Sequence, residues 1–236
     1  MANSEPISHP LANTGDDASV GDRAYELVRS DIIFAKLLPS HRLKLEQLRG
    51  EYGVSVGTLR ELLNRLAAEG LVVAEGQRGF EVAPVSAQNL REIAALRLLL
   101  ETHAMELSFE RGDMEWEGRV VAAYHKLSAM EQRLLSGDKS GTRTWKRYDW
   151  EFHHALISAC GSEVLLQTHA PVYDKYLRYQ MVAGIFRGKL PIAEHRMLQD
   201  AALKRDKASA CRVLSTHIND CVEFTIEYWA PFKRAR

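Results

Sequence analysis

The sequence lacks a surplus of positive charge, a cysteine framework and any long hydrophobic run. Its 31 lysines and arginines are balanced by 31 aspartates and glutamates, which excludes the uniformly basic coat of a non-specific nucleic-acid-binding protein. The three cysteines, Cys160, Cys211 and Cys221, form no CxxC pair, so neither a disulfide framework nor a zinc ribbon is expected. No segment approaches the roughly 18 apolar residues of a membrane span, and the N-terminus has no apolar signal core. We therefore expect a cytoplasmic protein that does not interact with membranes.

The distribution of helical patterns divides the chain into two domains with a tail at each end. Apolar residues make up 46% and charged residues 26% of the chain, proportions that indicate a folded globular protein and not a disordered one. We expect residues 1–22 to form a flexible tail, 23–84 a first domain, 85–230 a second domain and 231–236 a C-terminal tail. The expected fold class is mainly α, a winged helix-turn-helix followed by an all-α bundle of six or seven helices.

The first domain begins with three predicted helices. The first spans 23–38, and its apolar stripe consists of Leu27, Val28, Ile32 and Ala35. A second short helix spans 45–52 and closes at Gly53. A third follows Ser55, an N-cap residue type, and carries apolar residues along one face of 59–67. Two short helices joined by a glycine-containing turn are the pattern of a helix-turn-helix.

A predicted hairpin after the third helix indicates the winged form of this motif. Residues 71–73 are β-prone, 75–79 form a turn with two glycines, and 80–82 alternate like a returning strand before Pro84. The hairpin therefore carries a basic residue, Arg78, at its tip.

The polar surface of the third predicted helix points to DNA binding. In a helix-turn-helix the N-terminal residues of the second helix of the motif meet base edges, and residues 36–65 contain six basic side chains against three acidic ones. The candidate DNA-binding residues are Ser55, Thr58, Arg60, Asn64 and Arg65 on this helix, with Arg78 and Gly79 on the hairpin. The alternative is a small domain whose charged residues form an ordinary solvated face.

Several runs between residues 24 and 82 resemble the GntR family of bacterial regulators. The matching runs are 38–43 (LPSHRL), 52–55 (YGVS), 59–61 (LRE), 65–72 (RLAAEGLV) and 78–82 (RGFEV). The resemblance implies that Arg60 contacts operator DNA and that Arg78 and Gly79 enter the minor groove. The family usually places an arginine directly after the serine that corresponds to Ser55, but Val56 stands here. We therefore expect an operator that differs from the usual half-site at that position.

From Ser86 onward the sequence shows helical stripes and no strand alternation of any length. The apolar stripes are Leu90, Ile93, Ala94, Leu96 and Leu100, then Phe152, Leu156 and Ile157, then Val213, Leu214, Ile218 and Val222. Breaks fall near 112–113, 137–141, 161–162 and 188–191, where glycine and other helix-ending residues gather. This pattern predicts the all-α bundle.

Four residues of the predicted bundle form a candidate metal site. Asp149 and His153 are four residues apart and share one helix face. His195 and His217 each lie eleven residues from Asp206, so they face each other if that region is the turn between antiparallel helices. One carboxylate and three imidazoles suit one divalent transition metal per chain, zinc above all, with nickel, manganese or iron as alternatives. A purely structural role is the alternative for any single histidine. His154 and His169 are histidines of the same type outside the set.

The second domain resembles the ligand-binding FCD domain of the FadR-like subfamily of GntR regulators. The similarity rests on 152–153 (FH), 194–196 (EHR) and the 22-residue step from the second to the third candidate histidine. Metal-binding members of the subfamily use one aspartate and three histidines, which implies the same four ligands here. An arginine on the first helix of that domain often anchors a carboxylate effector, which implies Arg97. The alternative for Arg97 is an intrahelical pair with Glu101, of little energetic weight on a surface.

These observations favour a ligand-responsive transcriptional repressor. Residues 32–34 (IIF) and 54–61 (VSVGTLRE) also resemble regulators of glutarate and γ-aminobutyrate catabolism, which implies a glutarate-like dicarboxylate as the effector. Because one helix-turn-helix reads only a short half-site, we expect a homodimer on pseudo-palindromic operator DNA. The alternative is a metal-dependent hydrolase with a DNA-binding appendage, since such metal sites also activate water. No obvious general base or nucleotide-binding loop accompanies the four ligands.

Overall fold

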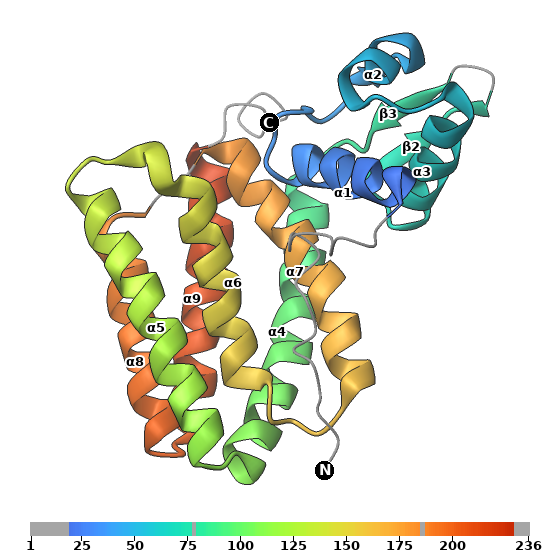
Figure 1. The fold of residues 1–236 in the computed structure, drawn as a ribbon. Helices are drawn as coiled ribbons and strands as arrows, with labels where there is room; N and C mark the ends of the chain where they lie inside the picture. The colour runs from blue at the N-terminus through green and yellow to red at the C-terminus, as the bar shows by residue number, and fades with distance from the viewer. Residues whose placement is uncertain (1–18, 77–78, 185–186, 229–236) are drawn as a thin grey trace. The chain divides into compact units, whose positions relative to one another are not determined.

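The computed structural model describes residues 19–76, 79–184 and 187–228. The chain divides into two compact units, Met1–Val85 and Ser86–Arg236, and each is described by itself. Helices dominate both units, and the strands are short (Figure 1). The expected fold class, mainly α, is confirmed.

The N-terminal unit has the elements of a winged helix-turn-helix. They are α1 (Val20–Ile33), β1 (Arg42–Leu43), α2 (Leu45–Tyr52), α3 (Val56–Ala68), β2 (Val72–Ala74) and β3 (Phe80–Val82). α2 ends at Gly53, whose φ of 67° is the left-handed conformation that glycine adopts without steric cost. The apolar faces of the helices and the sheet enclose one core, which includes Val28, Leu59, Leu63, Leu66 and Val82.

α1 differs from its prediction at both ends. The sequence places residues 20–22 in the tail, but they form the first turn of the helix, where Ser19 Oγ accepts a hydrogen bond from the Asp22 N–H at 3.1 Å. The helix ends five residues before the expected end, and Ala35 has a φ of 58°, outside the helical region. Leu27, expected in the apolar stripe, is exposed. The buried apolar residues of α1 are Ala24, Val28, Ile32 and Ile33.

A three-stranded antiparallel sheet in the order β1-β3-β2 completes this unit. β2 and β3 form the predicted hairpin, with Val72 opposite Val82. β1 is an addition to the prediction, and it pairs Arg42 with Glu81 and Leu43 with Phe80. A strand of two residues is too short to show alternation of apolar and polar side chains in the sequence. It is recognised only by its pairing with β3 in the structure.

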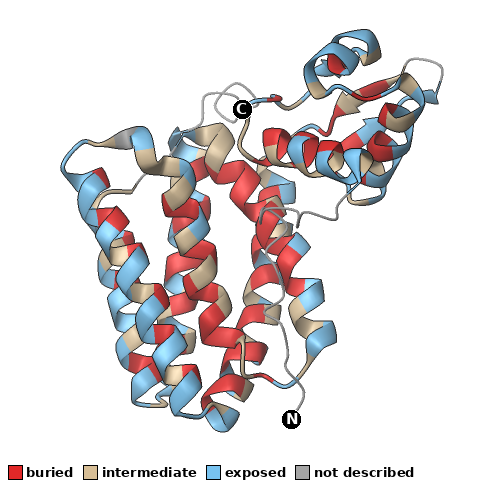
Figure 2. Ribbon diagram, in the orientation of Figure 1, coloured by how far each residue is buried: buried red, intermediate tan, exposed pale blue. Residues whose placement is uncertain are grey.

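The C-terminal unit is an all-α bundle. Its helices are α4 (Ala87–Arg111), α5 (Met114–Leu135), α6 (Thr142–Ile157), α7 (Glu163–Ala183), α8 (Lys189–Leu203) and α9 (Lys207–Tyr228), with a short 3-10 turn, η2 (Lys139–Gly141), before α6. α5 packs on α6 and α8, and α4 packs on α7 and α9. Figure 2 shows that the inward helix faces are buried and the outward faces exposed. The six α-helices in the described part of this unit agree with the predicted six or seven.

Helix boundaries in the bundle fall at the predicted breaks near 112–113, 137–141, 161–162 and 188–191. Local caps reinforce several of the helix starts. The capping side chains are Ser86 for α4, Asp113 for α5 and Ser162 for α7, and each accepts a hydrogen bond from the N–H three residues later. Within the described ranges, no helix reaches the length and hydropathy that a membrane crossing requires.

The buried face of α4 differs from the predicted apolar stripe. Leu90 and Ala94 are buried as expected, but Leu96 is 44% exposed. Arg97 and Glu101 lie in the interior instead. The apolar periodicity predicts the wrong buried face for α4, because the true buried face includes two charged residues that pair with each other.

Candidate DNA-binding surface and metal centre

The N-terminal turn of α3 lies at the surface of the N-terminal unit. Ser55 Oγ accepts a hydrogen bond from the Thr58 N–H at 3.1 Å and lies 3.0 Å from Thr58 Oγ1. Ser55 therefore caps the helix. The other N–H groups of a first helical turn have no partner within the helix, so this turn is suited to contact a phosphate.

The solvent side of α3 carries the other candidate DNA-binding residues. Arg60, Asn64 and Arg65 are exposed, whereas the leucines of the same helix are buried. Arg65 is partly engaged inside the unit, because its Nη1 lies 3.3 Å from Asp22 Oδ1 and its guanidinium 4.0 Å from the centroid of the Tyr25 ring. Arg60 and Asn64 have no such contact within the described ranges, so their side chains are available to a partner.

The hairpin tip lies only partly within the described residues. Gly79 has a φ of 92°, a conformation that favours glycine, and its carbonyl accepts a hydrogen bond from the Glu75 N–H at 2.8 Å. Arg78, predicted to contact DNA beside Gly79, lies outside the described residues.

Three helices of the bundle bring three buried histidines together, and we call them the three-histidine cluster: His153 on α6, His195 on α8 and His217 on α9. One ring nitrogen of each lies within 4.8 Å of a ring nitrogen of the other two. α8 and α9 form the antiparallel hairpin predicted around Asp206. The two histidines eleven residues from that turn therefore come level, with ring centroids 4.8 Å apart.

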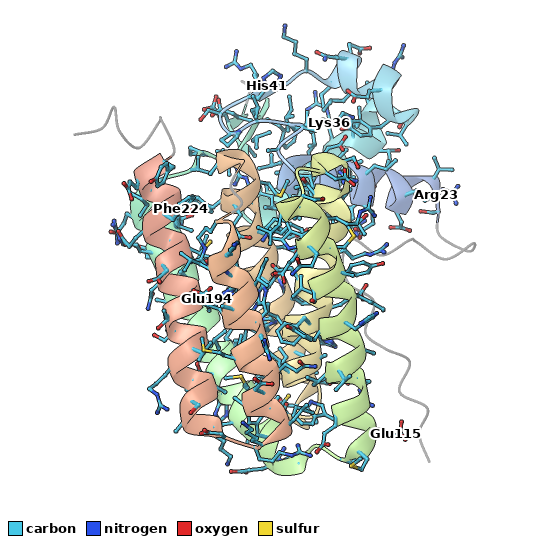
Figure 3. All side chains as sticks on the ribbon, turned by 90° about the vertical axis from the view of Figure 1, so that its left-hand side faces the viewer. Arg23, Lys36, His41, Glu115, Glu194 and Phe224 are labelled. Atoms are coloured by element: carbon cyan, nitrogen blue, oxygen red, sulfur yellow. The ribbon has the colours of Figure 1, made fainter. Side chains whose placement is uncertain are left out.

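Each histidine of the cluster is hydrogen-bonded through Nδ1 to a glutamate. The pairs are His153 with Glu101, His195 with Glu131 at 2.7 Å and His217 with Glu194 at 2.8 Å. Figure 3 labels Glu194 on α8. A carboxylate at Nδ1 holds the proton there in a neutral imidazole and leaves the Nε2 lone pair for a metal. The glutamates come from α4, α5 and α8, and apart from Glu194, which directly precedes His195, nothing local in the sequence marks them.

Asp149 lies beside the cluster, one helical turn before His153. Its Oδ1 is 3.3 Å from His195 Nε2. Its Oδ2 accepts hydrogen bonds from the Tyr173 hydroxyl at 2.7 Å and from Lys146 Nζ at 3.3 Å. The structure thus brings three of the four predicted ligands together and places the fourth, Asp149, next to His195.

Burial and neighbouring carboxylates act in opposite directions on the histidines. Burial disfavours a charge on His195, but hydrogen bonds to Asp149 and Glu131 outweigh burial and raise its pKa to about 9. Burial dominates at His217 and lowers its pKa to about 3, and it also lowers the pKa of His153. In the metal-free protein at neutral pH, His195 is therefore the protonated, positively charged histidine of the cluster.

The donor set fits a divalent transition metal. His153 Nε2 is buried and has no hydrogen-bond partner in the described part of the chain, which is costly for a polar atom unless another group satisfies it. Buried imidazoles whose second nitrogen is held by a carboxylate are the arrangement that zinc ligands adopt in proteins.

Arg97, expected to anchor an effector, pairs with Glu101 in the structure, and its role toward an effector stays a prediction. Its Nε donates to Glu101 Oε2 at 2.8 Å, and both side chains are 1% exposed. Its guanidinium also lies 4.4 Å and 4.7 Å from the ring centroids of Tyr173 and Tyr176. The intrahelical pair is therefore the observed arrangement, and its burial makes it unlike a weak surface pair. Arg97 stabilises Glu101 and, through it, the orientation of His153.

His154 and His169, two of the helical histidines outside the predicted set, have structural contacts. His169 Nε2 lies 3.2 Å from Glu101 Oε2, and its ring stacks on Trp150. His154 packs against the same tryptophan, and burial lowers its pKa to about 4. Neither belongs to the group whose nitrogens converge.

A narrow cavity opens beside the cluster. Its enclosed volume is about 20 Å³, which is the space of about one water molecule. His195, His217 and Asp149 line it, together with two cations that were not predicted, Lys146 and Arg187. Lys146 precedes Asp149 by three residues, a spacing that was available as a signal, whereas Arg187 lies in a connection without periodicity.

Comparison with known families identifies both units. Residues 21–82 match the family described as bacterial regulatory proteins, gntR family. Residues 92–220 match the FCD domain.

Named relatives match along most of the chain. The HTH-type transcriptional regulator BphR of Paraburkholderia xenovorans is 34% identical over 97% of this chain and 92% of its own length. The HTH-type transcriptional repressor GlaR of Escherichia coli is 32% identical over 82% of this chain and 90% of its own length.

Solved structures share the fold. A putative GntR regulator from Rhodococcus sp. RHA1 has a TM-score of 0.73 at 23% identity, and covers 90% of this chain and all of its own. E. coli McbR/YncC has a TM-score of 0.72 at 19% identity, over 89% of this chain and 98% of its own. The families and relatives describe regulators and lend no support to the hydrolase alternative. The chain therefore belongs to the GntR family of bacterial regulatory proteins and is a DNA-binding transcriptional regulator with a C-terminal FCD domain.

Proposed function

We propose that this regulator is a metal-containing repressor that a small carboxylate releases from its operator. The three-histidine cluster and Asp149 would hold one divalent transition metal, zinc above all, with nickel, manganese or iron as alternatives. The observation that carries the proposal is the set of three Nδ1–glutamate hydrogen bonds, which orients three buried imidazoles toward one point. A bound divalent ion supplies positive charge and coordination positions to which a carboxylate can bind.

The direction of regulation and the class of effector rest on similarity. GlaR, at 32% identity, is named a transcriptional repressor, which supports repression here. The resemblance to regulators of glutarate catabolism supports a glutarate-like dicarboxylate. A homodimer on a pseudo-palindromic operator follows from the short half-site that one recognition helix reads.

The effector acts only through a difference in affinity between the DNA-competent and DNA-incompetent states. An effector that weakens operator binding tenfold to a hundredfold must favour the incompetent state by about 1.4–2.8 kcal/mol. Linkage then requires operator DNA to weaken effector binding by the same factor.

The test combines metal analysis with operator release. We expect wild type and His154→Ala, the matched control, to contain about one equivalent of transition metal, and His217→Ala to lose most of it. Glutarate titrated into the protein–operator complex then releases wild type and His154→Ala but not His217→Ala. Release of all three proteins alike would show that the metal does not serve the effector, and absence of metal from wild type would reject the centre.

A further inference from the structure

The cavity beside the cluster contains a buried arginine that the metal centre alone does not explain. The Arg187 side chain, between α7 and α8, is 5% exposed. Its Nη2 donates to Glu194 Oε2 at 2.8 Å and to the His217 carbonyl at 3.2 Å. Its Nη1 is also buried, yet no residue of the described ranges accepts a hydrogen bond from it. Since an unsatisfied buried donor is costly, this nitrogen calls for an acceptor from outside the described residues.

A second cation, Lys146 on α6, lines the same cavity. Its side chain is 5% exposed, and its Nζ lies 3.3 Å from Asp149 Oδ2 and 3.9 Å from the centroid of the Trp145 ring. An ammonium group has three donors, and the hydrogen bond to Asp149 uses one of them. The fold thus brings two cations with spare donors, from separate elements, to one buried wall.

The charges of the surrounding shell nearly balance before any ligand is added. Arg187 is paired with Glu194 and Lys146 with Asp149, while Arg97 is paired with Glu101 on the far side of the cluster. A divalent ion adds two positive charges to this shell, and the carboxylate of Glu131 balances one of them when His195 binds the ion as a neutral imidazole. Because a buried net charge is costly, metal loading favours a ligand that brings negative charge of its own.

We propose that Arg187 and Lys146 form a second anchoring point for the effector, which is a small dicarboxylate held by the metal at one carboxylate and by these two cations at the other. The inference rests on the proposed metal-containing repressor, and it assigns to Arg187 and Lys146 the role that the sequence assigned to Arg97. A monocarboxylate reaches only one of the two anchors. The cavity has a volume of about 20 Å³, so a dicarboxylate binds there only when the side chains that line it move apart.

The experiment compares two probes of equal chain length, glutarate and pentanoate, by calorimetric titration into the metal-loaded full chain. We expect wild type to bind glutarate at least tenfold more tightly than pentanoate. Arg187→Met and Lys146→Met each lower glutarate affinity at least tenfold and leave pentanoate affinity unchanged. Arg196→Met, the matched control, removes an exposed arginine next to His195 and changes neither affinity.

Metal content, measured on every variant, separates this inference from the proposed function. Arg187 also contacts Glu194, so Arg187→Met can disturb the metal centre itself through that contact. If the Arg187→Met protein loses metal, the affinities of Lys146→Met alone test the inference. Equal affinity of metal-loaded wild type for the two probes, or binding of neither, overturns the inference while the metal centre stands. Persistence of the glutarate preference in metal-loaded Lys146→Met and Arg187→Met also overturns it. A wild type without metal removes the proposed function itself.

Discussion

The two units of this regulator use charged side chains in opposite ways. In the N-terminal unit, the candidate DNA-binding side chains Arg60 and Asn64 are exposed above an apolar core. In the C-terminal unit, charges and imidazoles lie inside the bundle and pair with one another, as Arg97 does with Glu101 and His195 with Glu131. A large polyanion such as DNA binds at the surface, where an unpaired arginine is solvated by water and costs little free energy. A small ligand must be enclosed, so the polar groups around it need partners already in place.

Removing one arginine from inside the bundle should have the largest effect. Arg97→Leu leaves the buried carboxylate of Glu101 without its cation. We expect the metal-free C-terminal unit to lose about 3–5 kcal/mol of unfolding free energy, as when one partner of a buried pair is removed. Urea denaturation followed by circular dichroism measures the loss.

The control for this change lies on the same helix. Arg91 pairs with Glu223, but the two side chains are 48% and 63% exposed, so Arg91→Leu is expected to cost at most about 1 kcal/mol. Equal destabilisation by Arg91→Leu and Arg97→Leu would contradict the distinction between paired interior charges and solvated surface charges.

Removing an arginine from the N-terminal unit tests the other side of the comparison. Arg60→Ala is expected to weaken specific operator binding by about 1–3 kcal/mol and to change stability by no more than about 0.5 kcal/mol. Fluorescence anisotropy at fixed salt measures the affinity. Arg119→Ala, which removes an exposed arginine of α5, serves as control, and a folded Arg60→Ala protein with wild-type operator affinity would show that α3 does not read the DNA.

The glutamates behind the histidines provide a third test. Glu131→Gln keeps the shape of the side chain at His195 but removes its charge. We expect metal affinity to fall about 10–100-fold, measured by competition with a chelator of known affinity. Glu151→Gln on α6, whose carboxylate pairs with surface Lys126, should leave metal affinity unchanged. A Glu131→Gln protein with wild-type affinity would mean that the hydrogen bond does not support the ligand.

The comparison also explains how far sequence reasoning reaches. In the N-terminal unit, Gly53 and Ser55 mark the ends of α2 and α3 because capping is local in the chain. Such signals predicted the recognition helix and the hairpin. The end of α1 was wrong, since no residue near position 34 announces that the chain leaves the helix there.

In the bundle, spacing along one helix or one helical hairpin predicted the three histidines that converge and the aspartate beside them. The same spacing could not predict partners from distant elements. Glu101 and Glu131, for example, contact the histidines only because their helices pack together. The burial of Arg97 against two tyrosines was also beyond that reasoning, because it depends on α7, which the sequence around Arg97 does not reveal.

Metal binding is expected to depend on pH through His195. In the metal-free protein its pKa is raised to about 9, whereas that of His217 is lowered to about 3. Between pH 7 and 9 a metal therefore displaces one proton, so the apparent affinity rises about tenfold per pH unit, equivalent to about 1.4 kcal/mol, and levels off above the pKa of His195. Titration in weak buffer should show release of about one proton at pH 7. No release would mean that His195 is neutral before the metal arrives.

The smallest expected effect separates two roles of Ser55 at the start of α3. Its hydroxyl caps the helix, so Ser55→Ala is expected to lower the stability of the N-terminal unit by about 1 kcal/mol. Aspartate is an equally good cap, and Ser55→Asp therefore keeps the stability of wild type in thermal denaturation. Its negative charge, however, would face the phosphates that the first turn of α3 is suited to meet, so operator affinity falls in Ser55→Asp even though the helix is intact. Wild-type operator affinity in Ser55→Asp would place Ser55 away from the DNA and leave it the capping role alone.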